Sequence, residues 1–187
     1  MVHLTPVRPD LPPITKSANA QINGEKHPLP FLVTTPLLYR HFYCDQILKH
    51  LGLEVLDVGN LRSMLDVHAP VEGSLEPQIE ALLNLKQRGL VRHRGLRNVT
   101  EKQVRDARAM TPVACVQNLY NLANRQDETM INLLSADGIP YVPFFPLGGF
   151  SPLQSKELNG IAETLNATPS QVALAWLLQR SPNILLI

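Results

Sequence analysis

The spacing of apolar and polar residues changes at about residue 31. Residues 1–30 show no period and are rich in proline and polar side chains, which predicts an irregular segment. From residue 31 onward, short apolar runs alternate with stretches whose apolar residues recur at helical spacing. We therefore expect an irregular segment over 1–30 and a folded region over 31–187.

Strands and helices are predicted to alternate through the folded region. The apolar runs predict strands at 31–35, 53–61, 90–96, 113–118, 140–145 and 183–187. The amphipathic stretches predict helices at 41–50, 74–88, 101–110, 127–136, 153–165 and from 169 onward. The last helix is apolar nearly all round, so we expect it to be deeply packed, with Trp176 in the core. Short links between alternating strands and helices favour a parallel sheet with right-handed crossovers.

Residues typical of helix ends support these boundaries. Thr100 with Gln103, and Thr168 with Gln171, have the spacing of capping boxes. Ser74 is a candidate N-cap for the helix over 74–88. Glycines follow three of the helices at the position where a left-handed conformation ends a helix: Gly52, Gly89 and Gly138.

Two architectures fit this order of elements, an open doubly wound sheet and a (β/α)8 barrel. The glycine-rich dinucleotide motif of the open sheet does not follow the first predicted strand. A full barrel needs about 250 residues, whereas this chain has 187. The pattern alone therefore leaves an open sheet and an incomplete barrel as alternatives.

Composition excludes several classes of partner. The net charge is +1 and aromatic residues make up 5%, which argues against binding to nucleic acid. Neither a leader-like apolar stretch nor an apolar run of about 18 residues is present, so no membrane span is expected. Cys44 and Cys115 lie in apolar patterns without metal-ligand spacing, which predicts buried free thiols and a cytoplasmic location.

Candidate chemistry lies where the predicted strands end, because the carboxyl ends of parallel strands carry the sites of such folds. Asn98 and Gln117 have amide side chains that can bind another amide, and Phe144 has a flat face. Together they suggest a planar ligand with a carboxamide. The alternative is structural, with Asn98 in a turn and Gln117 bound to neighbouring backbone.

Acid–base and metal chemistry are less well supported. No histidine is paired with a nearby serine or aspartate in a triad-like pattern, and no metal-binding motif is present. Asp57, inside a predicted strand, is the best candidate for an acid or base because a buried carboxylate needs a partner.

Four motifs, in order, resemble the aldo/keto reductases. They are "GLVRHRGLRNVT", "VACVQNLYNLANR", "GIPYVPFFPLGGFSPLQS" and "ATPSQVALAWLLQRSPNILLI". The resemblance covers about residues 50–187 and implies an α/β fold, an incomplete (β/α)8 TIM barrel comprising about strands three to eight and truncated at both ends. It also implies hydride transfer from NADPH to the carbonyl of a small molecule.

The resemblance assigns cofactor contacts but no catalytic residue. Asn98, Gln117 and Phe144 match positions that hold the nicotinamide in the family, so the implied cofactor is NADP(H). Arg97 stands where the family has a serine, and Arg62 stands where a histidine is frequent. The family's tyrosine acid and its supporting aspartate come from a region without a counterpart here.

Two functions follow as hypotheses. The first is an NADPH-dependent oxidoreductase for an aldehyde or ketone, impaired or inactive in this chain. The alternative is a non-catalytic fragment that associates, through open barrel edges, with itself or with another chain that supplies the missing strands. A third, weaker idea lets Tyr39 or Tyr43 replace the missing acid.

Overall fold

The computed structural model describes residue 44 and residues 47–63, 65, 69–149 and 155–186. These residues form a four-stranded parallel sheet of order β1-β2-β3-β4. The strands are β1 (Leu56–Arg62), β2 (Val91–Arg97), β3 (Cys115–Leu119) and β4 (Tyr141–Phe144). The helices are α2 (Glu76–Gln87), α3 (Glu101–Met110), α4 (Glu128–Ala136), α5 (Lys156–Thr164) and α6 (Pro169–Arg180).

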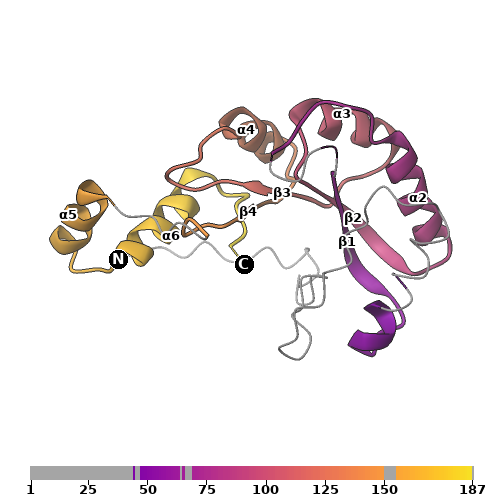
Figure 1. Cartoon of the computed structure of the whole chain (residues 1–187), viewed down its shortest axis with the longest axis horizontal. Coiled ribbons are helices and arrows are strands. Elements are labelled where there is room, and N and C mark those ends of the chain that lie inside the picture. Colours follow the sequence, from indigo (N-terminus) through magenta and orange to yellow (C-terminus); the bar gives the residue numbers. More distant parts are fainter. Residues whose placement is uncertain (1–43, 45–46, 64, 66–68, 150–154, 187) are drawn as a thin grey trace.

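Helices cover one face of the sheet (Figure 1). Helix α2 packs on β1, β2 and α3, and α4 packs on β4. Their buried side chains form one apolar core with the strands, and its innermost members include Leu61, Leu85, Val104, Val116, Ile131 and Leu134. Gly59 in β1 belongs to this face, where a Cβ atom would lie 3.1 Å from Val91 Cγ1. The glycine that weakens the strand pattern therefore allows close packing of β1 on β2.

The helix ends confirm most of the predicted capping. Both capping boxes form, with Thr100 on α3 and Thr168 on α6. The prediction that Ser74 is the N-cap of α2 is wrong, because the N-cap is Leu75, whose side chain makes no capping hydrogen bond. Ser74 Oγ instead accepts a 3.2 Å hydrogen bond from the backbone of Glu76. A proline at the start of α2 has the fixed backbone angle that suits this position, so the helix can begin without a side-chain cap.

The predicted strand at 183–187 is confirmed only at Ile184, which makes an isolated parallel bridge to Tyr141. At this bridge Tyr141 N donates to Asn183 O at 2.8 Å and Leu185 N donates to Tyr141 O at 2.9 Å, while Ile187 lies outside the described residues. The Asn183 side chain donates to Ile139 O and accepts from Ser181 Oγ, which holds the backbone in a turn. These local hydrogen bonds compete with strand pairing.

Helix α6 is less deeply packed than its sequence predicts. Only Ala173 and Leu177 are buried, whereas Leu178 is exposed. Trp176 is partly buried against the core, which confirms the interpretation of this residue as a packing residue. Among the described elements, α6 packs mainly against α5, and the two helices lie beyond β4 in Figure 1.

Some predictions lie at or outside the limits of the described residues. The irregular segment 1–30 and the strand 31–35 fall outside them, as do Tyr39 and Tyr43. Residues 47–51 are helical and are followed by Gly52 at φ +62°, in agreement with the predicted helix end. Within the described part of the chain, no helix is both long and apolar enough to cross a bilayer.

Candidate functional site

Three polar side chains lie in one row across the carboxyl ends of β1, β2 and β3. Arg62 is the register partner of Arg97, and Arg97 is the register partner of Gln117. Phe144 stands two residues beyond Val142, the partner of Gln117 in β4. Because side chains alternate between the faces of a sheet, all four lie on the same face. The structure thus brings two of the three predicted site residues, Gln117 and Phe144, onto one surface.

Gln117 has an acceptor that the described residues do not satisfy. Its side chain is 1% exposed, and its buried Oε1 accepts no hydrogen bond from the described part of the chain. A buried acceptor left without a donor costs about 1–3 kcal/mol. An N–H donor from a bound molecule would remove this cost, so the atom is suited to bind a carboxamide.

The backbone of Asn98 is hydrogen-bonded to the backbone of Gln117. Its backbone N donates to Gln117 O at 3.1 Å, and its φ of 56° is left-handed, which asparagine tolerates better than most residues. The side-chain amide donates to Ser63 O at 3.5 Å and to Ala69 O at 3.4 Å. Both distances are long for hydrogen bonds. Asn98 therefore forms the turn that the structural alternative predicts, and it lies beside the candidate site.

Arg97 covers the flat surface of Phe144. Its Cζ lies 4.9 Å from the centre of the ring, and the Phe145 ring meets Phe144 edge-on at 5.3 Å. Phe145 has a left-handed φ of 55°, and its carbonyl accepts from Asn121 Nδ2 at 2.9 Å. A planar ligand that stacks on Phe144 would share this ring with the guanidinium of Arg97.

The two arginines of the row raise the positive potential of the site. Burial lowers the pKa of Arg62. Burial also lowers the pKa of Arg97, and the nearby charge of Arg62 lowers it further. Ser63, which follows Arg62, is 1% exposed, and its Oγ makes no hydrogen bond with the described residues. The contact of Arg97 with Phe144 and the burial of Ser63 were not predicted, because strand spacing does not report which side chains meet.

A buried hydrogen-bond network supports the site from the helix-covered side. Asn118 Oδ1 accepts from Val99 N at 3.0 Å, while its Nδ2 donates to Val99 O at 2.8 Å and to Asp127 Oδ2 at 2.7 Å. Tyr141 OH donates to the same carboxylate oxygen at 2.8 Å. This network joins β3, β4 and the start of α4 to the backbone beside Asn98.

The pKa of Asp127 reflects two opposing effects. Burial raises it, and the hydrogen bonds from Tyr141 and Asn118 lower it, with a raised pKa as the result. Burial and the charge of Asp127 also raise the pKa of Tyr141 strongly, so its hydroxyl keeps its proton and acts as a donor. These roles were missed in the sequence, where Asp127 was only the first residue of a predicted helix.

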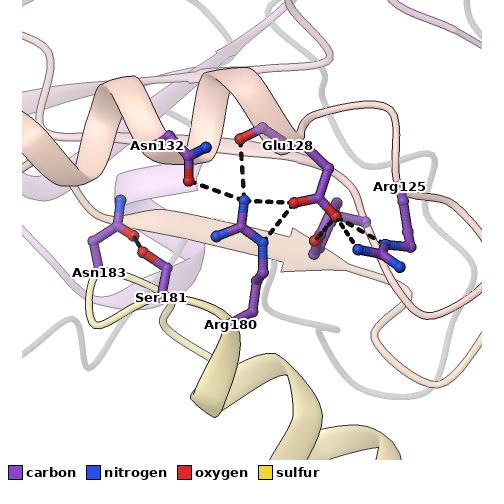
Figure 2. Close-up of polar contacts among 7 residues, drawn as sticks. Arg125, Glu128, Asn132, Arg180, Ser181 and Asn183 are labelled. Carbon is purple, nitrogen blue, oxygen red and sulfur yellow. Dashed lines mark hydrogen bonds and ion pairs between the residues drawn. The ribbon is translucent and has the colours of Figure 1, made fainter.

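A second network connects the last turn of α6 to the first turn of α4 (Figure 2). Arg180 Nε donates to Glu128 Oε2 at 2.5 Å, and its Nη2 donates to Glu128 O and Asn132 Oδ1. Glu128 Oε1 accepts from Arg125 and from Tyr120 OH. The Trp176 ring stacks on Tyr120 at 5.8 Å, and the Arg125 guanidinium lies 5.2 Å from its centre. This network serves packing rather than the site.

Asp57 is not the acid or base that the sequence suggested. It is exposed, pairs with Arg92 at 2.5 Å, and lies near the amino end of β1. Its position near the end of the strand leaves the carboxylate partly exposed to water, so it needs no buried partner. Among the described residues, no group of three or more His, Cys, Asp or Glu side chains could hold a metal. Cys44 and Cys115 are buried free thiols, as predicted.

Comparison with known proteins identifies the family. The family model described as "Aldo/keto reductase family" matches residues 42–187, so the chain belongs to this family of oxidoreductases. It is 61% identical over 141 residues to pyridoxine 4-dehydrogenase of Escherichia coli, covering 75% of this chain and 49% of that protein.

Solved structures support the same conclusion. An aldo/keto reductase of Klebsiella pneumoniae in complex with NADP and acetate superposes with a TM-score of 0.64 at 25% identity, covering 79% of this chain and 53% of that one. A thermostable aldo-keto reductase bound to epalrestat gives a TM-score of 0.65 at 27% identity, covering 79% and 54%. The chain spans about half the length of these relatives, and its parallel sheet is part of their (β/α)8 barrel, which confirms the predicted partial barrel.

The residues at the strand ends fit part of a nicotinamide cofactor. The unsatisfied Oε1 of Gln117 suits the amide of a carboxamide, and the Phe144 ring suits an aromatic ring. Arg97 shares the ring surface, so a stacked ligand requires a shift of its guanidinium. The fit concerns the nicotinamide end alone, since the described residues contain no comparable feature for the adenosine end.

Proposed function

We propose that this chain carries the nicotinamide-binding part of an NADPH-dependent oxidoreductase that reduces an aldehyde or ketone. The observation that supports it best is the buried Oε1 of Gln117, which lies in a row of strand ends and lacks a donor in the described structure. The membership of the chain in the aldo/keto reductase family supplies the class of reaction.

Three residues have separate roles in this proposal. Gln117 accepts a hydrogen bond from the carboxamide, Asn98 shapes the adjoining turn and offers its amide, and Phe144 stacks against the pyridine ring. NADPH, when bound, supplies the hydride.

The similarity to pyridoxine 4-dehydrogenase suggests a first substrate pair. We propose pyridoxine and the aldehyde derived from it by oxidation at position 4. An aldehyde attached to a pyridine ring is planar and can stack on the guanidinium of Arg97. The assay should therefore begin with this aldehyde and NADPH.

We further propose that activity is impaired in these 187 residues alone. The described side chains in the row at the strand ends are two arginines, an amide and a phenylalanine, and none has the pKa of a general acid near pH 7. General acid catalysis contributes about 10²–10⁴-fold to proton-transfer reactions. Turnover is thus expected to be slower by a factor of this size than in a reductase with such a donor.

Association with another chain is the second candidate. In the described part of the sheet, β1 pairs with β2 alone and is an edge strand. Ile161 and Leu165 on α5 and Leu178 on α6 are exposed apolar side chains. Edge strands and apolar surfaces of this kind favour pairing with further strands and helices, from a second copy or from another protein. A cytoplasmic location remains a proposal, supported by the two free thiols.

The test is a thermal melt of the purified chain with and without excess NADPH. A ligand at 100 times its dissociation constant stabilises the folded state by about 2.7 kcal/mol, which would raise the midpoint by several degrees. We expect Gln117→Met to reduce this shift and Gln87→Met, on the exposed end of α2, to preserve it. Equal melts with and without NADPH would contradict the proposal, as would an undiminished shift in Gln117→Met.

A further inference from the structure

Two positively charged side chains occupy adjacent positions at the site. Arg62 and Arg97 are direct register partners at the ends of β1 and β2. Neighbouring strands in a sheet are about 5 Å apart, so the side chains begin close together and leave the sheet on one face. Both are partly buried, which reduces the screening of their mutual repulsion by water.

The position of Arg97 is restricted further by its aromatic neighbour. Its guanidinium lies 4.9 Å from the centre of the Phe144 ring, so it is held above the surface proposed for the nicotinamide. Two cations thus adjoin a single position at the edge of the sheet.

We propose that Arg62 and Arg97 form a subsite for an oxyanion, a carboxylate or phosphate group, on the carbonyl substrate. Arginine binds both groups through paired N–H donors, and an anion between two like charges removes their repulsion. The lowered pKa values of the two guanidiniums agree with this geometry, because burial lowers both and the nearby charge of Arg62 lowers that of Arg97 further.

The subsite predicts a substrate preference within the proposed function. It selects aldehydes or ketones that carry an anionic oxygen group a short distance from the carbonyl, over neutral compounds of the same size. The inference depends on the proposed function for the identity of the anion as part of a substrate. Binding of a simple anion to the two arginines needs neither cofactor nor turnover, so it can be measured separately.

The experiment is residue-resolved modification of arginine by phenylglyoxal, followed by mass spectrometry of the full chain's peptides. Inorganic phosphate and acetate are the probes, each compared with chloride at equal ionic strength. Arg92 is the internal control, because it lies on β2, is exposed and pairs with Asp57 on the other face. At roughly four times the dissociation constant, a bound anion should slow modification of Arg62 and Arg97 about fivefold, because protection follows 1 + [L]/Kd.

The two probes distinguish the source of the oxyanion. Protection by phosphate alone supports a phosphate group, protection by acetate alone supports a carboxylate, and protection by both supports a general oxyanion subsite. Equal rates in all three salts would overturn the inference, and so would equal protection of Arg92. In a poorly folded chain the three arginines would react alike, and this result would also count against the inference.

Substitution gives a second measurement. The thermal midpoint of the unsubstituted chain should rise in phosphate or acetate relative to chloride, and Arg62→Met or Arg97→Met should abolish this rise, whereas Arg92→Met should preserve it. Persistence of the rise in both site variants would contradict the subsite. If NADPH raises the thermal midpoint but no anion protects the arginines, the subsite is overturned and the proposed function stands. If an anion protects the arginines but NADPH leaves the midpoint unchanged, the proposed function is overturned and the subsite stands.

Discussion

The amide nitrogen of Asn118 lies 2.7 Å from a carboxylate oxygen of Asp127, and the same amide group pairs with both the N–H and the C=O of Val99. One side chain thereby connects the end of β3 to the start of α4 and to the turn that contains Asn98. The backbone of Val99 has fixed hydrogen-bond partners because of this residue, and so the position of Asn98 relative to Gln117 depends on it.

Asn118→Leu should therefore destabilise the fold. It leaves the backbone groups of Val99 without their partners, and each buried unsatisfied group costs about 1–3 kcal/mol, so a loss of about 2–4 kcal/mol is expected. Urea unfolding of the variant measures this loss. Asn159→Leu, at an exposed position of α5, is the control and should change the stability little. A loss of the same size in both variants would show that the network contributes nothing specific.

The raised pKa of Asp127 predicts a pH dependence of stability. Because the folded state binds this proton more tightly than the unfolded state, the group favours folding at low pH. Its contribution then declines as the pH rises from the ordinary value of 3.8 to the higher folded pKa. Asp127→Asn should remove this decline, which equilibrium unfolding between pH 3 and pH 7 would detect; an unchanged slope would refute it.

Glu128 should show the opposite dependence. Burial raises its pKa, but hydrogen bonds from Arg125, Tyr120 and Arg180 outweigh this effect and leave the pKa below 4.5. Its contribution to stability is therefore present above pH 4.5 and is lost as the pH falls through the folded pKa. Glu128→Gln should flatten the acid limb of the stability curve. If the acid limb of this variant matches that of the unsubstituted chain, the assigned direction is wrong.

The two arginines bound to Glu128 should differ in their contribution. The side chain of Arg180 is 18% exposed and makes hydrogen bonds to Glu128 and Asn132, whereas that of Arg125 is 56% exposed. Arg180→Met should cost about 1–3 kcal/mol, as expected for hydrogen bonds to charged groups. Arg125→Met should cost much less, because exposed ion pairs contribute little. Urea unfolding compares them, and equal losses would contradict the assigned difference in burial.

Gly95 is a position where an added methyl group has no room. A Cβ atom there would lie 1.9 Å from Asn60 Oδ1 and 2.7 Å from Cys115 Sγ. Gly95→Ala should destabilise the chain by about 1–3 kcal/mol through overpacking. Adding Asn60→Ala should recover part of this loss, as measured by thermal melts of the two variants. If the double variant is destabilised as much as Gly95→Ala alone, the strain does not come from the contact with Asn60.

The order of the elements could be predicted from the sequence because it depends on local rules. Apolar periodicity and capping residues identified α3 and α6 at their correct N-termini, since a Thr side chain and a Gln three residues later satisfy backbone groups without help from distant segments. The same kind of rule failed at Asn183, where local side-chain hydrogen bonds prevailed over an apolar run that resembled a strand.

What the sequence by itself determined is the α/β pattern, the family resemblance and the presence of amides and an aromatic residue at strand ends. Only the tertiary structure decided which of these side chains meet. The register of β1, β2 and β3 placed Arg62, Arg97 and Gln117 in one row, and it left Asp57 exposed. Register depends on packing between strands that are distant in sequence, so neither spacing nor composition could reveal that Arg97 covers Phe144 or that Asp127 supports Asn118.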